Sequence, residues 1–188
     1  MGQQTKELEH ALVTTFGADR PGIVEEVSAW ILEQGGNIAD SRMARLGGEF
    51  ATLILVNGAA GLRDRLAATR EAFERRHQLT VLVKPVPPVP PAPAVPVLHY
   101  TLRATALDHP GIVHQVAALL RSRLINITAA ETHTTLAPFT GTPVFNFEME
   151  LDIPADVQPG ALREELRALG DREHIDFTLA PAGTQNRL

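Results

Sequence analysis

The sequence predicts an α+β protein built from two copies of one β-α-β-β-α-β unit. A hexapeptide at 19–24, Asp-Arg-Pro-Gly-Ile-Val, returns at 108–113 as Asp-His-Pro-Gly-Ile-Val. Each copy follows a strand-like run and opens a helix-like run. The same offset relates further pairs: Val27 and Val116, Asn37 and Asn126, Ile38 and Ile127. A repeat whose period is close to half the chain predicts two small domains rather than a solenoid.

Length and composition fit this organisation. The chain has 188 residues, of which 44% are hydrophobic and 21% charged, as in ordinary globular proteins. A net charge of −5 disfavours direct binding to nucleic acid or to an anionic membrane. The absence of cysteine excludes disulfides, thiolate nucleophiles and cysteine metal sites. No run of about 18 apolar residues and no apolar signal core occur, so we expect a cytoplasmic protein.

In the first unit, short runs rich in β-branched residues predict strands, and apolar residues at helical spacing predict helices. Pro21 suits the first helical position, where its missing N–H is not needed. Gly35-Gly36 then ends the helix, and Gly47-Gly48 fits a tight hairpin. The predicted elements are, in order, a strand at 10–17, a helix from Pro21, strands at 37–45 and 49–56, a helix with Leu62, Leu66 and Phe73, and a strand with Leu79, Val81 and Val83.

The second unit repeats this order, with a longer hairpin at 136–143. Pro159 fits the first turn of its last helix. Its predicted elements are a strand at 99–106, a helix with Ile112, Val116 and Leu120, strands at 126–135 and 145–151, a helix with Leu162, Leu166 and Leu169, and a strand with Ile175, Phe177 and Leu179. Each unit should therefore fold as a four-stranded antiparallel sheet with both helices on one face.

A proline-rich segment at 85–96 separates the units and holds seven of the 14 prolines. We expect domains at 1–84 and 97–188, joined by a semi-rigid polyproline II spacer of roughly 35 to 40 Å. The alternative is a ligand for a proline-reading protein module. Such motifs usually carry a flanking Arg or Lys, and the nearest here is Lys84.

The repeated hexapeptide places a proline and a glycine where a helix begins. The N-terminus of a helix offers unpaired N–H groups and the positive end of a dipole, which suit a small anion such as a carboxylate. Asp19 and Asp108 could cap the helix or pair with the ammonium group of a ligand. These residue types fit a zwitterionic amino acid. A plain strand-to-helix turn with a cap is the alternative.

Asn37 and Asn126 lie where the first helix of each unit passes into the second strand. In a compact unit, this turn lies at the opposite end of the helix from the hexapeptide. The two features could therefore share a ligand only across an interface between two copies of the unit. Alternatively, the asparagines are residues that tolerate a left-handed turn.

The Asp-Arg-Pro-Gly-Ile-Val motif, with Gly-Gly-Asn-Ile at the start of the second strand, resembles the ACT domain, a ferredoxin-like module. Two such units, over about 8–84 and 97–181, resemble the glycine cleavage system transcriptional repressor family. The resemblance implies a non-enzymatic regulator without a cofactor, which forms a homodimer and senses an amino acid such as glycine. It also implies a protein partner, a transcriptional activator that this protein would hold inactive. A generic ACT regulator of another metabolic target is the alternative.

The effector contacts that the resemblance implies come from the two matching motifs. They are Asp19, Arg20, Gly22, Ile23, Asn37 and Ile38, and then Asp108, His109, Gly111, Ile112, Asn126 and Ile127. The second unit departs from the pattern, because Leu124-Ile125 replaces Gly35-Gly36 and should deny its turn the same freedom. It also has His109 in place of Arg20. The two sites could therefore differ, or only one of them could bind.

The sheet faces turned away from the helices are expected to differ between the units. In the second unit, the residues on this face are polar: Thr101, Arg103, Asn146, Glu148 and Glu150. In the first, Leu12 and Phe16 lie in the phase opposite to the core positions Ala11, Val13 and Thr15. Exposed apolar residues usually mark an interaction surface. We therefore expect this face to pack on a second chain or on the other half of the chain.

Two rival functions fit the sequence less well. An enzyme is disfavoured because His109 and His114 would diverge on a helix, and no nucleophile elbow, phosphate-binding loop or paired carboxylates are visible. An RNA-binding module shares the strand order but needs exposed aromatic and basic residues on its central strands. The second unit offers Glu148 and Glu150 there instead.

Overall fold

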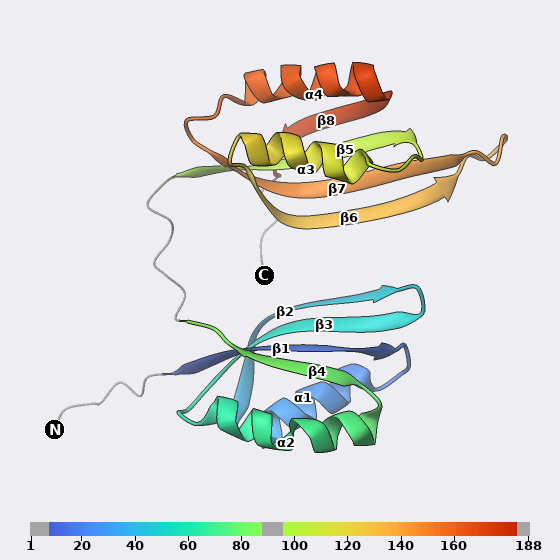
Figure 1. Cartoon of the computed structure of the whole chain (residues 1–188). Coiled ribbons are helices and arrows are strands. Elements are labelled where there is room, and N and C mark those ends of the chain that lie inside the picture. Colours follow the sequence, from blue (N-terminus) through green and yellow to red (C-terminus); the bar gives the residue numbers. More distant parts are fainter. Residues whose placement is uncertain (1–7, 88–95, 184–188) are drawn as a thin grey trace. The chain divides into compact units, whose positions relative to one another are not determined.

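The structure is a computed structural model that describes residues 8–87 and 96–183. It contains two four-stranded antiparallel sheets, each within a β-α-β-β-α-β unit (Figure 1). The predicted fold class is therefore confirmed. The chain divides into two compact units between Pro91 and Ala92, which we call repeat 1 and repeat 2. Most of the predicted linker lies at 88–95, outside the described residues.

Repeat 1 follows the predicted order of elements. Its sheet has the strand order β2-β3-β1-β4, and both helices cover one face of it (Figure 1). Gly47 and Gly48 have φ angles of 60° and 86°, as a two-residue hairpin of the predicted kind requires. The elements are β1 (Glu9–Ala18), α1 (Ile23–Glu33), β2 (Gly36–Leu46), β3 (Glu49–Gly58), α2 (Leu62–His77) and β4 (Thr80–Pro85).

Repeat 2 has the equivalent strand order, β6-β7-β5-β8. Its hairpin between Leu136 and Pro143 is longer, as predicted, and Pro159 opens the last helix. The elements are β5 (Val97–Leu107), α3 (Ile112–Ser122), β6 (Asn126–Leu136), β7 (Pro143–Pro154), α4 (Pro159–Glu173) and β8 (Ile175–Pro181).

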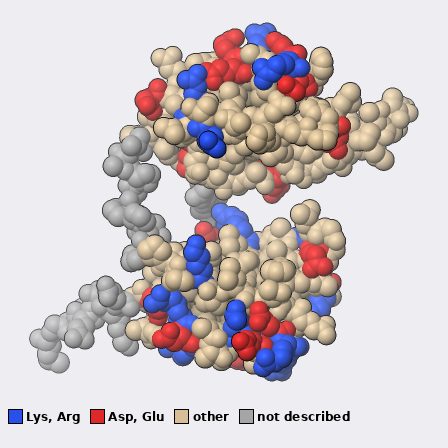
Figure 2. All heavy atoms as spheres, viewed as in Figure 1, with Lys and Arg blue, Asp and Glu red and all other residues tan. Residues whose placement is uncertain are grey.

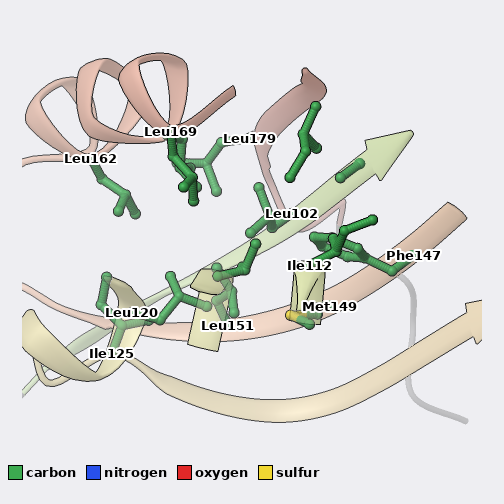
Figure 3. Close-up of a cluster of buried hydrophobic side chains, with 14 of the residues drawn as sticks. Leu102, Ile112, Leu120, Ile125, Phe147, Met149, Leu151, Leu162, Leu169 and Leu179 are labelled. Carbon is green, nitrogen blue, oxygen red and sulfur yellow. The ribbon is translucent and has the colours of Figure 1, made fainter. Parts of the chain in front are cut away.

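Each repeat buries its own apolar core between its helices and its sheet. In repeat 2, Leu162 and Leu169 point from α4 toward the sheet, which supplies Leu102, Met149 and Leu151 (Figure 3). Repeat 1 adds two stacked aromatic rings, since the Trp30 and Phe73 centroids lie 4.7 Å apart. Burial of this kind, at roughly 25 cal/mol per Å² of apolar area, is the main force that holds each repeat together.

The helix starts differ from the prediction. Pro21 and Pro110 lie in the turns before the helices, and α1 and α3 begin two residues later, at Ile23 and Ile112. The reason is the preceding glycine, because Gly22 has a φ of 97° and cannot be part of a right-handed helix. Neither helix has a side-chain cap, so the expectation that Asp19 or Asp108 could cap it is wrong.

The expectation that Leu124 denies its turn the freedom of Gly35 is also wrong. Leu124 has a φ of 55°, close to the 74° of Gly35. Both turns make the same hydrogen bond, from Gly35 N to Leu32 O at 2.9 Å and from Leu124 N to Arg121 O at 3.0 Å. Repeat 2 therefore keeps the turn at the cost of placing a leucine in a left-handed conformation.

The sheet faces away from the helices differ as predicted. Strand pairing aligns the open-face residues of repeat 1, most of which are apolar along the two central strands: Leu12, Phe16, Ala51, Leu53 and Leu55, with Leu82 beside them on β4. Phe16, Leu53 and Leu82 are about half exposed. In repeat 2 the same face holds cross-strand polar pairs, Arg103 with Glu148 at 2.7 Å and Thr105 with Asn146 at 3.0 Å.

Charged side chains of both signs are interspersed over the helical side of each repeat, on the face that Figure 2 shows. None of the helices in the described ranges has the length and apolar character needed to cross a membrane. Within the same ranges, no three His, Asp or Glu residues gather as a metal site would require.

Candidate ligand-binding site

The repeated hexapeptide forms the same turn in both repeats. Gly22 and Gly111 have φ angles of 97° and 102°, which L side chains rarely adopt. Each glycine carbonyl then accepts the first helical hydrogen bond, from Glu26 N at 2.9 Å and from Gln115 N at 3.0 Å. The backbone N–H groups of the first helical turn are left without helical partners and are available to an anion.

In repeat 1, a hollow of about 630 Å³ lies against this turn. It is lined by the whole hexapeptide and by three further residues, Glu25 and Ser28 of α1 and Phe50 of β3. Phe50 reaches the turn because Asp19 N donates to Gly48 O at 2.9 Å, which holds the β2–β3 hairpin beside it. Phe50 was not among the predicted site residues, although its place two residues after the predicted Gly47-Gly48 hairpin was a usable signal.

The Asp19 carboxylate faces the second strand rather than the helix. It lies 3.5 Å from Arg45 at the end of β2, and about a third of its side-chain surface is exposed. In repeat 2, the matching Asp108 accepts from the Thr134 hydroxyl of β6 at 3.4 Å. Both carboxylates therefore lie at the corner between the turn and the edge strand, where a ligand ammonium group could reach them.

Arg20 has its hydrogen bonds within repeat 1. Its guanidinium donates to both Glu26 oxygens, at 2.8 and 2.6 Å, and to the His77 carbonyl oxygen at 2.9 Å. His77 Nδ1 also lies 2.9 Å from Glu26 Oε2. The Arg20 guanidinium and, to a lesser extent, His77 hold the pKa of the Glu26 carboxyl below its ordinary value, against the opposing effect of burial. Arg20 thus ties the turn to the end of α2.

Repeat 2 rebuilds this tie with other groups. His109 replaces Arg20, Gln115 replaces Glu26, and the acid moves to Glu173, the last residue of α4. Gln115 Nε2 donates to Glu173 Oε2 at 3.1 Å. This hydrogen bond, with Arg172 and His109, lowers the pKa of the Glu173 carboxyl. The two turns are therefore alike in backbone but different in charge.

The asparagine turns lie at the other end of each sheet. Asn37 stands opposite Asn57 near the end of β3, whereas the hexapeptide turn is held beside Gly48 at its start. Ten strand residues at about 3.4 Å each separate the two features by roughly 30 Å. The prediction that the two features lie at opposite ends of the unit is confirmed for repeat 1. In repeat 2, Asn126 likewise pairs with Asp152, far along β7 from the hairpin.

Three of the four isoleucines of the predicted site contribute to the cores, whereas Ile38 is 36% exposed. Ile23 and Ile112 are each 2% exposed. Ile38 stands opposite Val56 on the helix-covered face, and Ile127 stands in the same way opposite Leu151. The buried side chains of Ile23 and Ile112 hold the two hexapeptide turns against the cores.

Two compact α+β repeats, each with a glycine turn before its first helix, give the chain the architecture of a tandem ferredoxin-like module. Residues 9–84 match the model of the ACT domain family. The chain is 27% identical over 166 residues to the glycine cleavage system transcriptional repressors of Escherichia coli (strain K12) and Shigella flexneri. Each alignment covers 88% of this chain and 86% of the relative.

Two solved structures share the fold of the whole chain. A crystal structure of an unknown protein from Galdieria sulphuraria is 28% identical, with a TM-score of 0.75, and covers 94% of this chain and 100% of that one. The crystal structure of a candidate glycine cleavage system transcriptional repressor shares the fold, with a TM-score of 0.68, 24% identity and coverage of 93% and 97%. Repeat 1 thus matches the ACT domain family, and the chain over most of its length is similar to glycine cleavage system transcriptional repressors.

Proposed function

We propose that this protein is a non-enzymatic amino-acid sensor of the cytoplasm that controls transcription through a protein partner. The observation that carries the proposal is the hollow of about 630 Å³ at the glycine turn of repeat 1. It combines free helix N–H groups with a nearby carboxylate, Asp19. The relatedness to glycine cleavage system repressors supports an effector such as glycine.

In this proposal the effector carboxylate binds the N–H groups that follow Gly22, where the helix dipole favours negative charge. The effector ammonium group pairs with Asp19. Val24, about half exposed, and Phe50 line the same hollow and limit the size of the effector side chain. The two charged groups of a zwitterion thus have partners of opposite polarity at this corner. Arg20 is not needed for these contacts, because it is hydrogen-bonded to Glu26.

A second chain completes the proposed arrangement. Because Asn37 lies at the far end of the sheet, it can reach an effector only from another copy of the domain. The apolar open face of repeat 1 offers such a copy a surface. Its edges carry both signs of charge, Asp40 and Arg42 on β2 and Lys84 on β4. Mixed charges at the rim allow two identical faces to pair around a two-fold axis.

The protein partner is proposed to be a transcriptional activator of glycine cleavage genes, held inactive by contact. Regulation through a partner suits a chain with a net charge of −5. The alternative is an ACT regulator that senses an amino acid on behalf of another metabolic target, and the same effector corner would serve it.

Thermal unfolding in the presence of each of the twenty amino acids tests the sensing role. An effector at 100 times its dissociation constant should stabilise the folded chain by about 2.7 kcal/mol. Glycine or a similarly small amino acid is expected to raise the melting temperature most. A melting temperature that no amino acid changes would contradict the proposal and leave only a protein-interaction role.

A further inference from the structure

At one end of the open face of repeat 1, polar side chains from all four strands lie next to one another. His10 of β1 stands opposite Asn57 of β3, and Asn57 stands opposite Asn37 of β2. Lys84 of β4 stands opposite Leu12, one step along the same face from His10. Directly opposite residues have Cβ atoms about 5 Å apart, and diagonal neighbours about 7–8 Å, within reach of a lysine. We call these four residues the His10 cluster.

Repeat 2 has equivalent residues at the same register, and one of them carries a carboxylate. His99 stands opposite Asp152, and Asp152 stands opposite Asn126. His99 Nδ1 and Asp152 Oδ1 are 2.7 Å apart, within hydrogen-bond distance. Ala180, opposite Thr101, takes the place of Lys84. Repeat 2 therefore shows where a carboxylate satisfies the histidine of this cluster.

Repeat 1 lacks that carboxylate. Nδ1 of His10, the ring nitrogen that His99 uses, is buried and has no hydrogen-bond partner among the described residues. A buried polar atom without a partner is costly, and a bound molecule is one way to satisfy it. Relative to repeat 2, Asn57 removes one negative charge, and Lys84 adds one positive charge. The site has thus lost its own anion and gained a cation.

We propose that the His10 cluster binds a small carboxylate, which supplies the negative charge that Asp152 provides in repeat 2. The amide groups of Asn37 and Asn57 donate to its oxygens, and Lys84 adds a charge-assisted hydrogen bond. Leu12 and Leu55, the next pair along the face, contact the apolar part of the ligand. Binding of a carboxylate follows from the residues of the His10 cluster and does not depend on the proposed function. The inference rests on the proposed function only in naming an amino acid as the physiological source.

The test follows the imidazole signals of the full-length chain, labelled at histidine, by NMR. Sodium acetate and glycine are titrated separately, with sodium chloride at equal ionic strength as the control, and the His10 signal is assigned by its loss in His10→Gln. Acetate is expected to shift the His10 signal in a saturable way, and sodium chloride is not. A His10 signal that responds no more to acetate than to sodium chloride would overturn the proposal.

A reciprocal pair of substitutions makes the test specific. Asn57→Asp builds the carboxylate of repeat 2 into repeat 1 and should weaken acetate binding at His10 at least about tenfold. Asp152→Asn removes the internal carboxylate of repeat 2 and should create a new saturable acetate response at His99. Undiminished binding in Asn57→Asp would contradict the inference, even if Asp152→Asn had failed to fold.

The two proposals fail in different ways. If acetate moves the His10 signal but no amino acid binds more tightly than acetate, the carboxylate site stands and amino-acid sensing is contradicted. If amino acids raise the melting temperature while the His10 signal is unmoved and Asn57→Asp leaves the rise intact, sensing stands and the carboxylate site is overturned.

Discussion

The two repeats share a backbone fold but differ in the chemistry of the sheet face that is turned away from the helices. Repeat 1 exposes leucines and a phenylalanine between its strand edges, whereas repeat 2 covers the same positions with polar pairs such as Arg103 and Glu148. The cores, by contrast, are built alike, from apolar residues of the helices and the sheet. A duplicated unit has therefore kept the residues that hold its fold and changed those that meet other molecules.

The same division holds at the corners and at the strand ends. Repeat 1 has a hollow against its glycine turn, and its His10 cluster has no carboxylate of its own. In repeat 2, Glu173 joins the turn to α4, and Asp152 satisfies His99. The strand-end cluster of repeat 1 is thus open where Asp152 fills that of repeat 2, whereas both turns are tied by side chains that differ in charge.

The largest expected difference concerns assembly. Leu12→Lys with Phe16→Lys places two charges on the apolar face of repeat 1 and should reduce the mass in light scattering from that of two chains to that of one. The matched control is Thr101→Lys with Thr105→Lys, at the equivalent positions of repeat 2, and it should leave the mass unchanged. A chain that keeps its mass in the first variant, with a native melting curve, would contradict the proposed dimer face.

A buried polar pair also separates the repeats. Thr15 and Thr52 share a 2.8 Å hydrogen bond beneath the helices, where repeat 2 has Ala104 and Phe147. Thr15→Val leaves the Thr52 hydroxyl buried without a partner and should lower the free energy of unfolding by about 1–2 kcal/mol. Replacing both threonines with valine should recover most of the loss. Urea denaturation measures both, and a double variant less stable than either single one would refute this explanation.

The turn after the first helix gives a smaller effect with opposite signs in the two repeats. Leu124 has a φ of 55° and is largely exposed, so Leu124→Gly should raise the free energy of unfolding by about 0.5–1 kcal/mol. Gly35→Ala, at the matching position, should lower it by a similar amount. Both changes are measured by urea denaturation. A destabilised Leu124→Gly chain would show that the leucine contributes more than its strain costs.

The smallest expected effect is a pH dependence of the stability that the Glu26 interactions with Arg20 and His77 contribute. Arg20 lowers the pKa of this carboxyl in the folded chain, so its contribution is full above the ordinary value of 4.5 and is lost as the pH falls through the folded value. Glu26→Gln should therefore be less stable than the parent at pH 7, with a difference that shrinks below pH 4.5. Glu25→Gln, one residue away, is the control. A difference that does not vary with pH would contradict this assignment.

Much of the fold could be predicted from the sequence because its signals are local. The Gly47-Gly48 hairpin, the alternation of Leu12 and Phe16 with the core, and the repeat itself each depend on residues close together in the chain. The helix starts were missed by two residues, because the positive φ of Gly22 is a property of the folded turn. Leu124 was misjudged because the turn is set by its neighbours: backbone hydrogen bonds to the end of α3 and the buried Ile125 hold the left-handed conformation, although Leu124 itself is largely exposed.

The candidate site was harder to predict, because its partners depend on strand register. The longer hairpin of repeat 2 changes the offset, so Asn57 and Asp152 match only once both strands are paired with β1 and β5. The hydrogen bonds of Arg20 to Glu26 and His77 could not be predicted, because they depend on where α2 ends. Register and helix ends are set by packing of the whole repeat, which no single motif reports.

Calorimetric titration of two matched variants tests most directly the claim that repeat 1 is the sensing unit. The titrant is the amino acid that raises the melting temperature most. Asp19→Ala should remove its binding at the hollow, and Asp108→Ala should leave the affinity of that site within about a factor of two, because Asp19 lines the hollow of repeat 1. Binding that survives in Asp19→Ala and is lost in Asp108→Ala would contradict the account.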